Sequence, residues 1–463
     1  MADPTFQSIA QLSAALTAGR LDAVALARAC LDRIEGPGRV LNAFVTVCRE
    51  AALGAAAEAA ARAAAGRRLG PLDGIPIALK DNIDLAQVPT GNGFGGAPWR
   101  VPDQDAEVVR RLRAAGAVIL GKLNMHEGAL GATNDNPHVG RAHNPHKVGV
   151  TPGGSSGGSG AAVAAGLCAA ALGTDTGGSV RLPASYCGVV GLKPSYGLVS
   201  TRGVVPLSYR LDHVGPLTRT VEDAGLMLAA MAGLDPECPE ARARPVPAPG
   251  GAPIALHGIR LGVLANLDAE PPEPAIADAF AAARALFARL GAAVETIRLP
   301  SYDVARGRRA GFIRVEAEAA FVHGALCQRE PERFSPELRG FLEYGARLTA
   351  QQLLQADRRI DLAAFELDRA FAAVDAIIGP TAAQVAFAFG QKPPDNQSSY
   401  TILANFAGCP AISLPMGATR DGMPIGLHVM APAGRDGVAL RIAAAYEAAS
   451  AWRLVPPPPH GPA

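Results

Sequence analysis

The sequence predicts an α/β fold, with a mixed, largely doubly wound central sheet and helices on both of its faces. Apolar runs of strand length alternate with segments of helical periodicity through the first half of the chain, which is the pattern of strand–helix–strand units. Hydrophobic residues make up 49% of the 463 residues and charged residues only 18%, which is enough apolar material for a large core. Further apolar runs follow in the second half without an internal repeat, so one domain over residues 1–463 is expected.

The first half of the chain provides the clearest elements. Strands are expected over residues 74–79, 117–120 and 169–172, and helices over residues 8–35, 47–68, 106–115 and 159–167. The first of these strands ends at Lys80. Asp105 is a suitable N-cap for the helix that starts at residue 106, and Gly116 is suited to end that helix.

The second half begins with a stretch of different composition. Residues 239–257 are rich in Pro, Ala and Gly, and they are expected to form a surface connection. Beyond this connection, strands are expected over residues 259–264, 374–378, 411–415 and 425–430, and helices around residues 271–290, 313–328, 350–372 and 437–450.

Charge and cysteine content exclude several classes of protein. The formal net charge is +1, which gives no electrostatic basis for binding nucleic acid or a membrane surface. Residues 1–20 lack a basic segment followed by an apolar one, and no uncharged run of 18 strongly apolar residues occurs. The seven cysteines are odd in number and form no CxxC pair, which indicates free thiols in a reducing compartment. The sequence therefore predicts a cytoplasmic protein that binds neither nucleic acid nor a membrane.

Two glycine-flanked serine clusters are the most distinctive feature of the chain. Residues 153–159 read Gly-Gly-Ser-Ser-Gly-Gly-Ser, and residues 173–181 read Gly-Thr-Asp-Thr-Gly-Gly-Ser-Val-Arg. The second cluster follows one predicted strand, and Lys80 follows another. Because sites in open α/β sheets lie outside the carboxyl ends of the strands, both groups are expected at the same edge of the sheet.

These residue types fit nucleophilic catalysis. A serine hydroxyl is a weak nucleophile until a base takes its proton, and lysine can be that base only in its neutral form. Apolar residues precede Lys80, but Asp81 follows it and would raise the pKa of Lys80 if the two side chains were close.

The second cluster also suits an oxyanion hole. Backbone N–H groups of the loop Thr176, Gly177, Gly178 and Ser179 can converge on one oxygen because glycines leave room for it. Each such donor contributes roughly 3–4 kcal/mol to the transition state.

Together the clusters resemble the signature of the amidase signature family. Other short segments match that family as well: Gly74-Ile75-Pro76, Lys80-Asp81-Asn82, Lys122-Leu123-Asn124-Met125-His126-Glu127, Gly191-Leu192-Lys193-Pro194, Gly215-Pro216-Leu217, Asn405-Phe406-Ala407-Gly408-Cys409-Pro410-Ala411-Ile412-Ser413 and Pro424-Ile425-Gly426-Leu427. The resemblance is dense over residues 70–220, returns over residues 395–430, and is thin over residues 230–390. It implies the amidase signature fold, with a signature core at 70–220 and a variable substrate-pocket region at 230–390.

The resemblance also implies a Ser–Ser–Lys triad. Ser179 would be the nucleophile and Lys80 the terminal base and acid. Ser155, 24 residues before Ser179, would relay the proton and would be joined to Gly154 by a cis peptide bond. The implied reaction is hydrolysis of a carbon–nitrogen bond of a small amide, anilide or carbamate, or of an ester, through an acyl-enzyme.

Further roles follow from the same resemblance. Asp175 and Arg181 would support the loop, whereas Met125 and Gly154 would contact the substrate. Neither a cofactor nor a metal ion is implied. A homodimer is compatible with the family, although no interface can be assigned from the sequence.

A second function within the family is that of the amidase component of a glutamine-dependent tRNA amidotransferase. That component usually carries a Tyr-rich segment before the helix corresponding to residues 340–360. Here residues 343–350 read Glu-Tyr-Gly-Ala-Arg-Leu-Thr-Ala without such a cluster. This departure favours a stand-alone hydrolase. A binding protein with an inactive site is disfavoured while all three triad positions are occupied.

Other interpretations of the motifs are weaker. Residues 153–157 also satisfy the G-x-S-x-G elbow of α/β-hydrolases. That fold needs a later acid and histidine, and its histidine could be His213, His257, His323, His428 or His460. Residues 91–96 match G-x-G-x-x-G but run into Pro98 and not into a helix, so they indicate a turn. His126 lacks the second histidine of a zinc helix, and His138, His143 and His146 lie in a loop rich in Pro and Asn.

Overall fold

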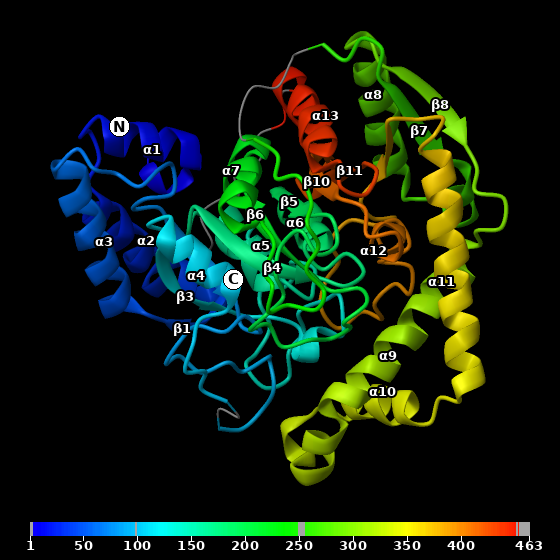
Figure 1. Cartoon of the computed structure of the whole chain (residues 1–463), viewed down its shortest axis with the longest axis horizontal. Coiled ribbons are helices and arrows are strands. Elements are labelled where there is room, and N and C mark those ends of the chain that lie inside the picture. Colours follow the sequence, from blue (N-terminus) through cyan, green and yellow to red (C-terminus); the bar gives the residue numbers. More distant parts are fainter. Residues whose placement is uncertain (1–2, 98–99, 249–254, 451, 453–463) are drawn as a thin grey trace.

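Eleven strands within the described residues form one mixed sheet, as predicted (Figure 1). The computed structural model describes residues 3–97, 100–248, 255–450 and 452. The strands are β1 (Phe44–Val47), β2 (Pro76–Lys80), β3 (Val118–Leu123), β4 (Ala170–Asp175), β5 (Val190–Lys193), β6 (His213–Thr218), β7 (Arg260–Leu264), β8 (Ala293–Ile297), β9 (Ala376–Pro380), β10 (Ala411–Ala418) and β11 (Pro424–Met430). Their order across the sheet is β1-β3-β2-β4-β6-β5-β10-β11-β9-β7-β8.

The helices surround this sheet. They are α1 (Ile9–Thr17), α2 (Ala23–Glu35), α3 (Arg49–Ala64), α4 (Glu107–Ala114), α5 (Gly157–Ala164), α6 (Arg181–Cys187), α7 (Val221–Met231), α8 (Pro274–Arg289), α9 (Val304–Arg329), α10 (Pro336–Ala346), α11 (Ala350–Ala370), α12 (Ile402–Phe406) and α13 (Asp436–Ala449). Short 3₁₀ turns occur at Pro4–Phe6, Pro37–Leu41, Glu127–Ala129, Ala265–Ala269 and Pro331–Arg333.

Parallel pairing is confined to two parts of the sheet. β2 pairs in parallel with β3 and β4, and β7 pairs in parallel with β8 and β9. Helices connect these strands in the chain, as parallel crossovers require. The strands between them, from β6 through β11, pair antiparallel. Since β7, β8 and β9 belong to the same sheet as β2 and β4, the second half of the chain extends the sheet that the first half begins.

Most predicted elements are present, although β1, β5, β6 and β8 were not predicted, and two of the predictions differ in detail. The expected helix at 8–35 is split, because Gly19 in the left-handed region follows α1 and Asp22 then caps α2. Asp105 does not cap α4, whose N-cap is Ala106 without a side-chain hydrogen bond. Asp105 instead accepts a hydrogen bond from Ala86 N–H at 2.8 Å.

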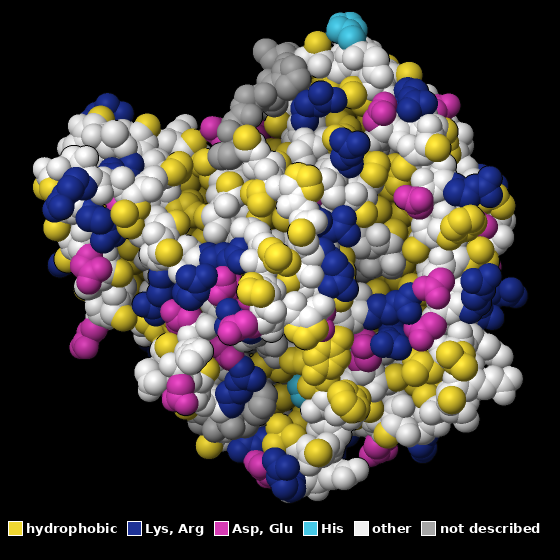
Figure 2. Space-filling view, viewed as in Figure 1, with side chains coloured by type: hydrophobic (Ala, Val, Ile, Leu, Met, Phe, Trp, Pro, Cys, Tyr) yellow, Lys and Arg dark blue, Asp and Glu magenta, His cyan; other side chains and the backbone are white. Residues whose placement is uncertain are grey.

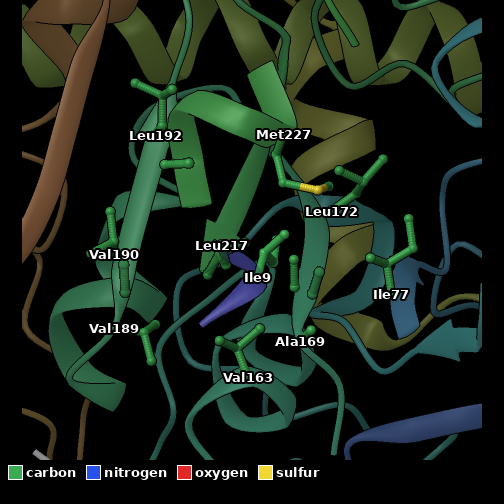
Figure 3. Close-up of a cluster of buried hydrophobic side chains, with 14 of the residues drawn as sticks. Ile9, Ile77, Val163, Ala169, Leu172, Val189, Val190, Leu192, Leu217 and Met227 are labelled. Carbon is green, nitrogen blue, oxygen red and sulfur yellow. The ribbon is translucent and has the colours of Figure 1, made fainter. Parts of the chain in front are cut away.

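The main core lies against the middle of the sheet. Figure 3 shows apolar side chains from β2, β4, β5 and β6 packed with others from α1, α5 and α7. Among them, Leu172, Leu217 and Met227 are fully buried. Burying a side chain of this size contributes roughly 1.5–3 kcal/mol, so this layer holds the strands that carry the two serine clusters.

A second apolar cluster lies under α9, α10 and α11. These three helices form an arm at the lower right of Figure 1, and their buried side chains meet residues from the 91–96 turn and from α12. Val315, Leu338 and Ile360 represent the three helices in this cluster. The arm therefore packs on the same side of the molecule as the loops that follow β4 and precede β10.

The molecular surface carries mixed charge. Figure 2 shows Lys and Arg side chains interspersed with Asp and Glu over the visible face. The described parts of the 239–257 connection contain neither helix nor strand, and its residues 249–254 lie outside the described residues. All seven cysteines are unpaired. Among the described residues, no helix has the length and apolar character needed to cross a bilayer.

Two glycine-to-alanine substitutions compare a tightly packed position in the central strand β6 with an open position in helix α9. A Cβ at Gly215 of β6 would lie 2.0 Å from the Leu192 carbonyl oxygen, so Gly215→Ala is expected to destabilise the protein by about 1–3 kcal/mol. Gly324 of α9 faces open space, and Gly324→Ala is expected to add about 0.5–1 kcal/mol because alanine is a better helix former. Thermal unfolding midpoints check both, and an unchanged midpoint for Gly215→Ala would contradict the close strand packing.

Candidate active site

Lys80 and Ser155 meet at the carboxyl edge of the two parallel strands. Lys80 is the last residue of β2, and Thr174 lies near the end of the neighbouring β4. The Lys80 Nζ lies 2.7 Å from Ser155 Oγ and 2.7 Å from Thr174 Oγ1. All three side chains are buried. The structure therefore brings together two of the three predicted triad residues and adds Thr174, which the sequence analysis did not single out.

The environment of Lys80 favours the neutral amine. Burial lowers the pKa of Lys80 to about 7, although the carboxylates of Asp212 and Asp175 act in the opposite direction. Asp81, the expected source of a raised pKa, lies 3.4 Å from Lys122 Nζ and forms an ion pair with that lysine. A lysine in this state can accept a proton near neutral pH.

The first serine loop is shaped by a close approach of backbone. The Gly154–Ser155 peptide bond is cis. A Cβ at Gly154 would lie 2.8 Å from the Ala132 carbonyl carbon, so a side chain does not fit there. The Ser155 carbonyl accepts a hydrogen bond from His126 N–H at 3.0 Å. These contacts leave the Ser155 hydroxyl directed at Lys80.

The other serines of this loop have different partners. Ser156 Oγ donates to the Thr174 carbonyl at 3.1 Å, and Ser159 Oγ donates to the Leu172 carbonyl at 2.9 Å. Both hydroxyls thus attach the start of α5 to β4. Residues 154–158 also fit G-x-S-x-G with Ser156 at the centre, but the hydroxyl of Ser156 is bonded to a strand carbonyl and is not positioned as a nucleophile.

Ser179 lies in the turn after β4 and is half-buried. Ser156 N–H donates to the Ser179 carbonyl at 3.2 Å, so the backbones of the two serine clusters are joined directly. Between the described side chains of Ser155 and Ser179 there is no direct hydrogen bond. The transfer of a proton between them remains a prediction.

The donors available in this turn are fewer than the sequence suggested. Gly178 has φ +137°, and a Cβ there would lie 2.3 Å from Thr401 Oγ1, so this position requires glycine. Its N–H already donates to Asp175 Oδ1 at 2.8 Å. Among the described residues, no acceptor is bonded to the N–H groups of Gly177 and Ser179. Thr176 N–H also has no acceptor among these residues, so the N–H groups of Thr176, Gly177 and Ser179 are the free donors of this turn.

Asp175 and Arg181 form a buried, two-pronged ion pair at the base of the turn. Arg181 Nη2 lies 2.8 Å from Asp175 Oδ1, and Arg181 Nε lies 3.0 Å from Oδ2. Burial opposes ionisation of Asp175, but the charge and hydrogen bonds of Arg181, with Lys193 and Asn405, hold the pKa of Asp175 far below its usual range. Asp175 also accepts from Val180 N–H at 3.1 Å. The pair thus fixes the turn from both ends.

The tail of the chain completes this support. Arg181 donates to the Thr401 carbonyl at 2.8 Å and to Asn405 Oδ1 at 2.7 Å. Asn405 Nδ2 in turn donates to Asp175 Oδ1 at 2.9 Å. No role was predicted for Asn405. Its place in the 405–413 segment that resembles the family, more than 200 residues from the serine clusters, was the available signal.

Among the candidate histidines, His428 and His213 have partners other than the serine clusters, and His460 lies outside the described residues. His428 Nε2 accepts from Arg181 Nη1 at 3.0 Å, and burial with the nearby Arg181 charge lowers the pKa of His428 well below its usual value. His213 lies 2.7 Å from the Leu211 carbonyl through Nδ1. Among the described residues, no histidine ring is hydrogen-bonded to Ser155, Ser156 or Ser179.

Other candidate residues take structural positions. Met125 is fully buried in the second apolar cluster. The 91–96 turn wraps around Asp81, whose carboxylate accepts from the N–H groups of Gly91 and Gly93. No group of three or more metal-binding side chains occurs within the described ranges. His138 instead pairs with Glu127 at 3.1 Å.

Comparison with known proteins gives consistent matches. The Amidase family profile matches residues 25–440. A Glutamyl-tRNA(Gln) amidotransferase subunit from Gloeobacter violaceus is 39% identical over 481 residues, covering 96% of this chain and 97% of that protein.

Solved structures agree with this match. The native peptide amidase of Stenotrophomonas maltophilia superposes with a TM-score of 0.86 at 34% identity, covering 98% of both chains. A chain from a vestigial protein complex linked to the evolutionary origins of an s-triazine catabolic enzyme superposes with a TM-score of 0.90 at 33% identity, covering 96% of this chain and 98% of that chain. The chain therefore belongs to the amidase family and is a hydrolase of carbon–nitrogen bonds.

Proposed function

We propose that the chain hydrolyses a small amide-type substrate through an acyl-enzyme on Ser179, with Ser155 as proton relay and Lys80 as base and acid. The observation that carries this proposal is the 2.7 Å contact between Ser155 Oγ and the Nζ of a fully buried lysine. A buried lysine with a pKa near 7 is the form that can act as a base. The family membership of the chain supports the same assignment.

The proton path follows from the chemistry of the three groups. Ser179 Oγ attacks the substrate carbonyl carbon and passes its proton to Ser155 Oγ, while the Ser155 proton moves to the lone pair of Lys80. The N–H groups of neutral Lys80 remain available for Thr174 Oγ1. The path then reverses, and the leaving nitrogen receives the proton as the carbon–nitrogen bond breaks. Water hydrolyses the resulting Ser179 ester by the same relay.

The negative oxygen of the tetrahedral intermediate needs donors beside Ser179. The N–H groups of Thr176, Gly177 and Ser179 are unpaired among the described residues, so we assign the oxyanion hole to them. Each donor would contribute roughly 3–4 kcal/mol to transition-state stability. Gly178 contributes its conformation, since its own N–H is bonded to Asp175.

The remaining predicted residues have supporting roles in this proposal. Asp175 and Arg181 hold the Ser179 turn, and Gly154 would contact the substrate through its backbone beside Ser155. Met125 would reach the substrate from the apolar cluster beneath the site. We retain one domain over residues 1–463, with the signature core at 70–220 and the pocket region at 230–390.

A partner-dependent role is the second candidate, because the Gloeobacter relative belongs to an amidotransferase. Here the segment at 343–350 carries one tyrosine, Tyr344, which stacks under the Arg309 guanidinium at 4.9 Å. A lone tyrosine bound to its own chain favours the stand-alone hydrolase. We further propose a cytoplasmic location, since seven free thiols suit a reducing compartment.

Substitution of the triad tests the mechanism. Ser179→Ala is expected to abolish covalent labelling by a fluorophosphonate, and Lys80→Ala is expected to lower kcat at least 10³-fold, as loss of a general base does. His428→Gln keeps an acceptor for Arg181 and should retain most activity. Equal losses in Lys80→Ala and His428→Gln would refute the lysine relay.

The pH dependence follows from the pKa of Lys80. Below about pH 7 Lys80 is protonated and cannot accept the Ser155 proton, so kcat/KM is expected to fall tenfold per pH unit on the acid side and to level off above pH 8. The rate of fluorophosphonate labelling should show the same fall on the acid side of its pH profile, here called the acid limb. A rate independent of pH between 5 and 8 would contradict a neutral lysine base.

Activity of the purified chain alone separates the two candidate functions. Short amides, anilides, carbamates and esters are each assayed with and without glutamine. Turnover of at least one of them in the absence of any partner or glutamine is expected. Strict dependence on a second protein and on glutamine would favour the amidotransferase role, and Ser179→Ala serves as the background control.

A further inference from the structure

Asp212 lies opposite the Ser179 turn at the end of an antiparallel strand pair. The last residue pair of the β4–β6 ladder is Asp175 with His213. One step further, Thr176 after β4 meets Asp212 before β6, and Thr176 Oγ1 donates to Asp212 Oδ1 at 2.6 Å. The carboxylate is therefore attached to the first residue of the turn that ends at Ser179.

Alternation along β4 places Asp212 on the Lys80 side of the sheet. Thr174 and Thr176 are two residues apart, so their side chains leave the strand on the same face. Thr174 Oγ1 contacts Lys80 Nζ, and Thr176 Oγ1 contacts Asp212. Of the two carboxylates that raise the pKa of Lys80, Asp212 has the larger effect.

The carboxylate of Asp212 is fixed from several directions. Its Oδ2 accepts from Leu207 N–H at 2.8 Å and from Ser208 N–H at 3.0 Å. Ser208 Oγ donates to Glu318 of α9, and Arg314 of the same helix holds Glu318 at 2.8 Å. Three hydrogen-bond donors hold this partly buried carboxylate in one position and favour its ionised form.

We propose that Asp212 is a positioning residue of the hydrolase, which holds Thr176 and supplies the counter-charge for the ammonium that Lys80 becomes. This role rests on the proposed Ser179–Ser155–Lys80 mechanism. When Lys80 takes the relayed proton, a positive charge appears in a buried site, and a fixed negative charge nearby lowers the energy of that state. The hydrogen bond to Thr176 ties the same carboxylate to the donors at Gly177 and Ser179.

The charges around Asp212 define its state during catalysis. Lys80 of β2 and Glu318 of α9 interact with it electrostatically, and its charge raises the pKa of the phenols of Tyr196 and Tyr209. Burial raises the pKa of Asp212 to about 6, against the effect of its three hydrogen-bond donors, and Glu318 adds to the rise. The carboxylate is therefore ionised at pH 7.5, where Lys80 is largely neutral.

Asp212→Asn tests this role with a p-nitrophenyl ester and a fluorophosphonate as probes. The expected result is a kcat lower by about 10- to 100-fold with KM changed less than threefold. Removal of the negative charge lowers the pKa of Lys80, so the acid limb of both the kcat profile and the labelling rate should move to lower pH. A purely structural role would lower the rate without moving that limb.

Two further variants separate charge from position. Asp212→Glu keeps the charge and should restore the acid limb to its wild-type pH. Thr176→Val removes the hydrogen bond to Asp212 but keeps the Asp212 charge, so it should lower kcat without shifting the acid limb. This variant tests positioning even if Asp212→Asn fails to fold. Asp375→Asn, a matched carboxylate just before β9 that pairs with the Arg260 side chain and accepts from Arg260 N–H, should leave both rate and limb unchanged.

The outcomes separate the role of Asp212 from the Ser179–Ser155–Lys80 mechanism. If Ser179→Ala is still labelled, the proposed triad is wrong and the proposed role of Asp212 is refuted as well. If Ser179→Ala abolishes labelling while folded Asp212→Asn and Thr176→Val keep the wild-type rate and limb, only the role of Asp212 is refuted. A loss in Asp212→Asn without any shift of the limb would refute the counter-charge.

Discussion

The buried pair of Asp175 and Arg181 is the interaction on which the site depends. Both side chains are fully buried, and an unpaired charge there would cost about 3–5 kcal/mol. The carboxylate binds the turn that carries Ser179, and the guanidinium binds Thr401 and Asn405 from the tail. The pair therefore makes the position of Ser179 depend on a segment more than 200 residues later in the chain.

Burial favours the neutral form of Lys80, whereas Asp175 stays ionised beside Arg181. Among the described residues, Lys80 Nζ hydrogen-bonds to two hydroxyls and to no carboxylate, so burial lowers its pKa. Lys122 on the neighbouring strand β3 shows the alternative, since it is also buried but has Asp81 at 3.4 Å. Lys80 thus has hydroxyl partners, whereas Lys122 is part of an ion pair, and this difference in partners sets the difference between the two buried lysines.

Local patterns were sufficient to predict most of the strands and the residues at their ends. Lys80 and the serine clusters follow apolar runs, and the parallel pairing of β2 with β4 brings them together as expected. Elements without a clear apolar run, such as β6 and α10, were not predicted. The partners Asn405 and Asp212 were also missed, because their roles arise from a tail segment and from a strand register that no short stretch of sequence encodes. The assignment of Asp105 as a cap was wrong because the same carboxylate had a competing backbone donor, Ala86 N–H.

The two serine clusters contain four serines, and their partners assign them different tasks. Ser156 and Ser159 bind strand carbonyls and hold α5 to β4, so their hydroxyl protons are already committed to the fold. Ser155 is bonded to a group whose protonation changes, and Ser179 is the one half-buried hydroxyl of the four. A relay requires one serine that exchanges protons and one that a substrate can reach. Exposure and the identity of the partner, more than position in the motif, therefore decide which hydroxyl can be the nucleophile.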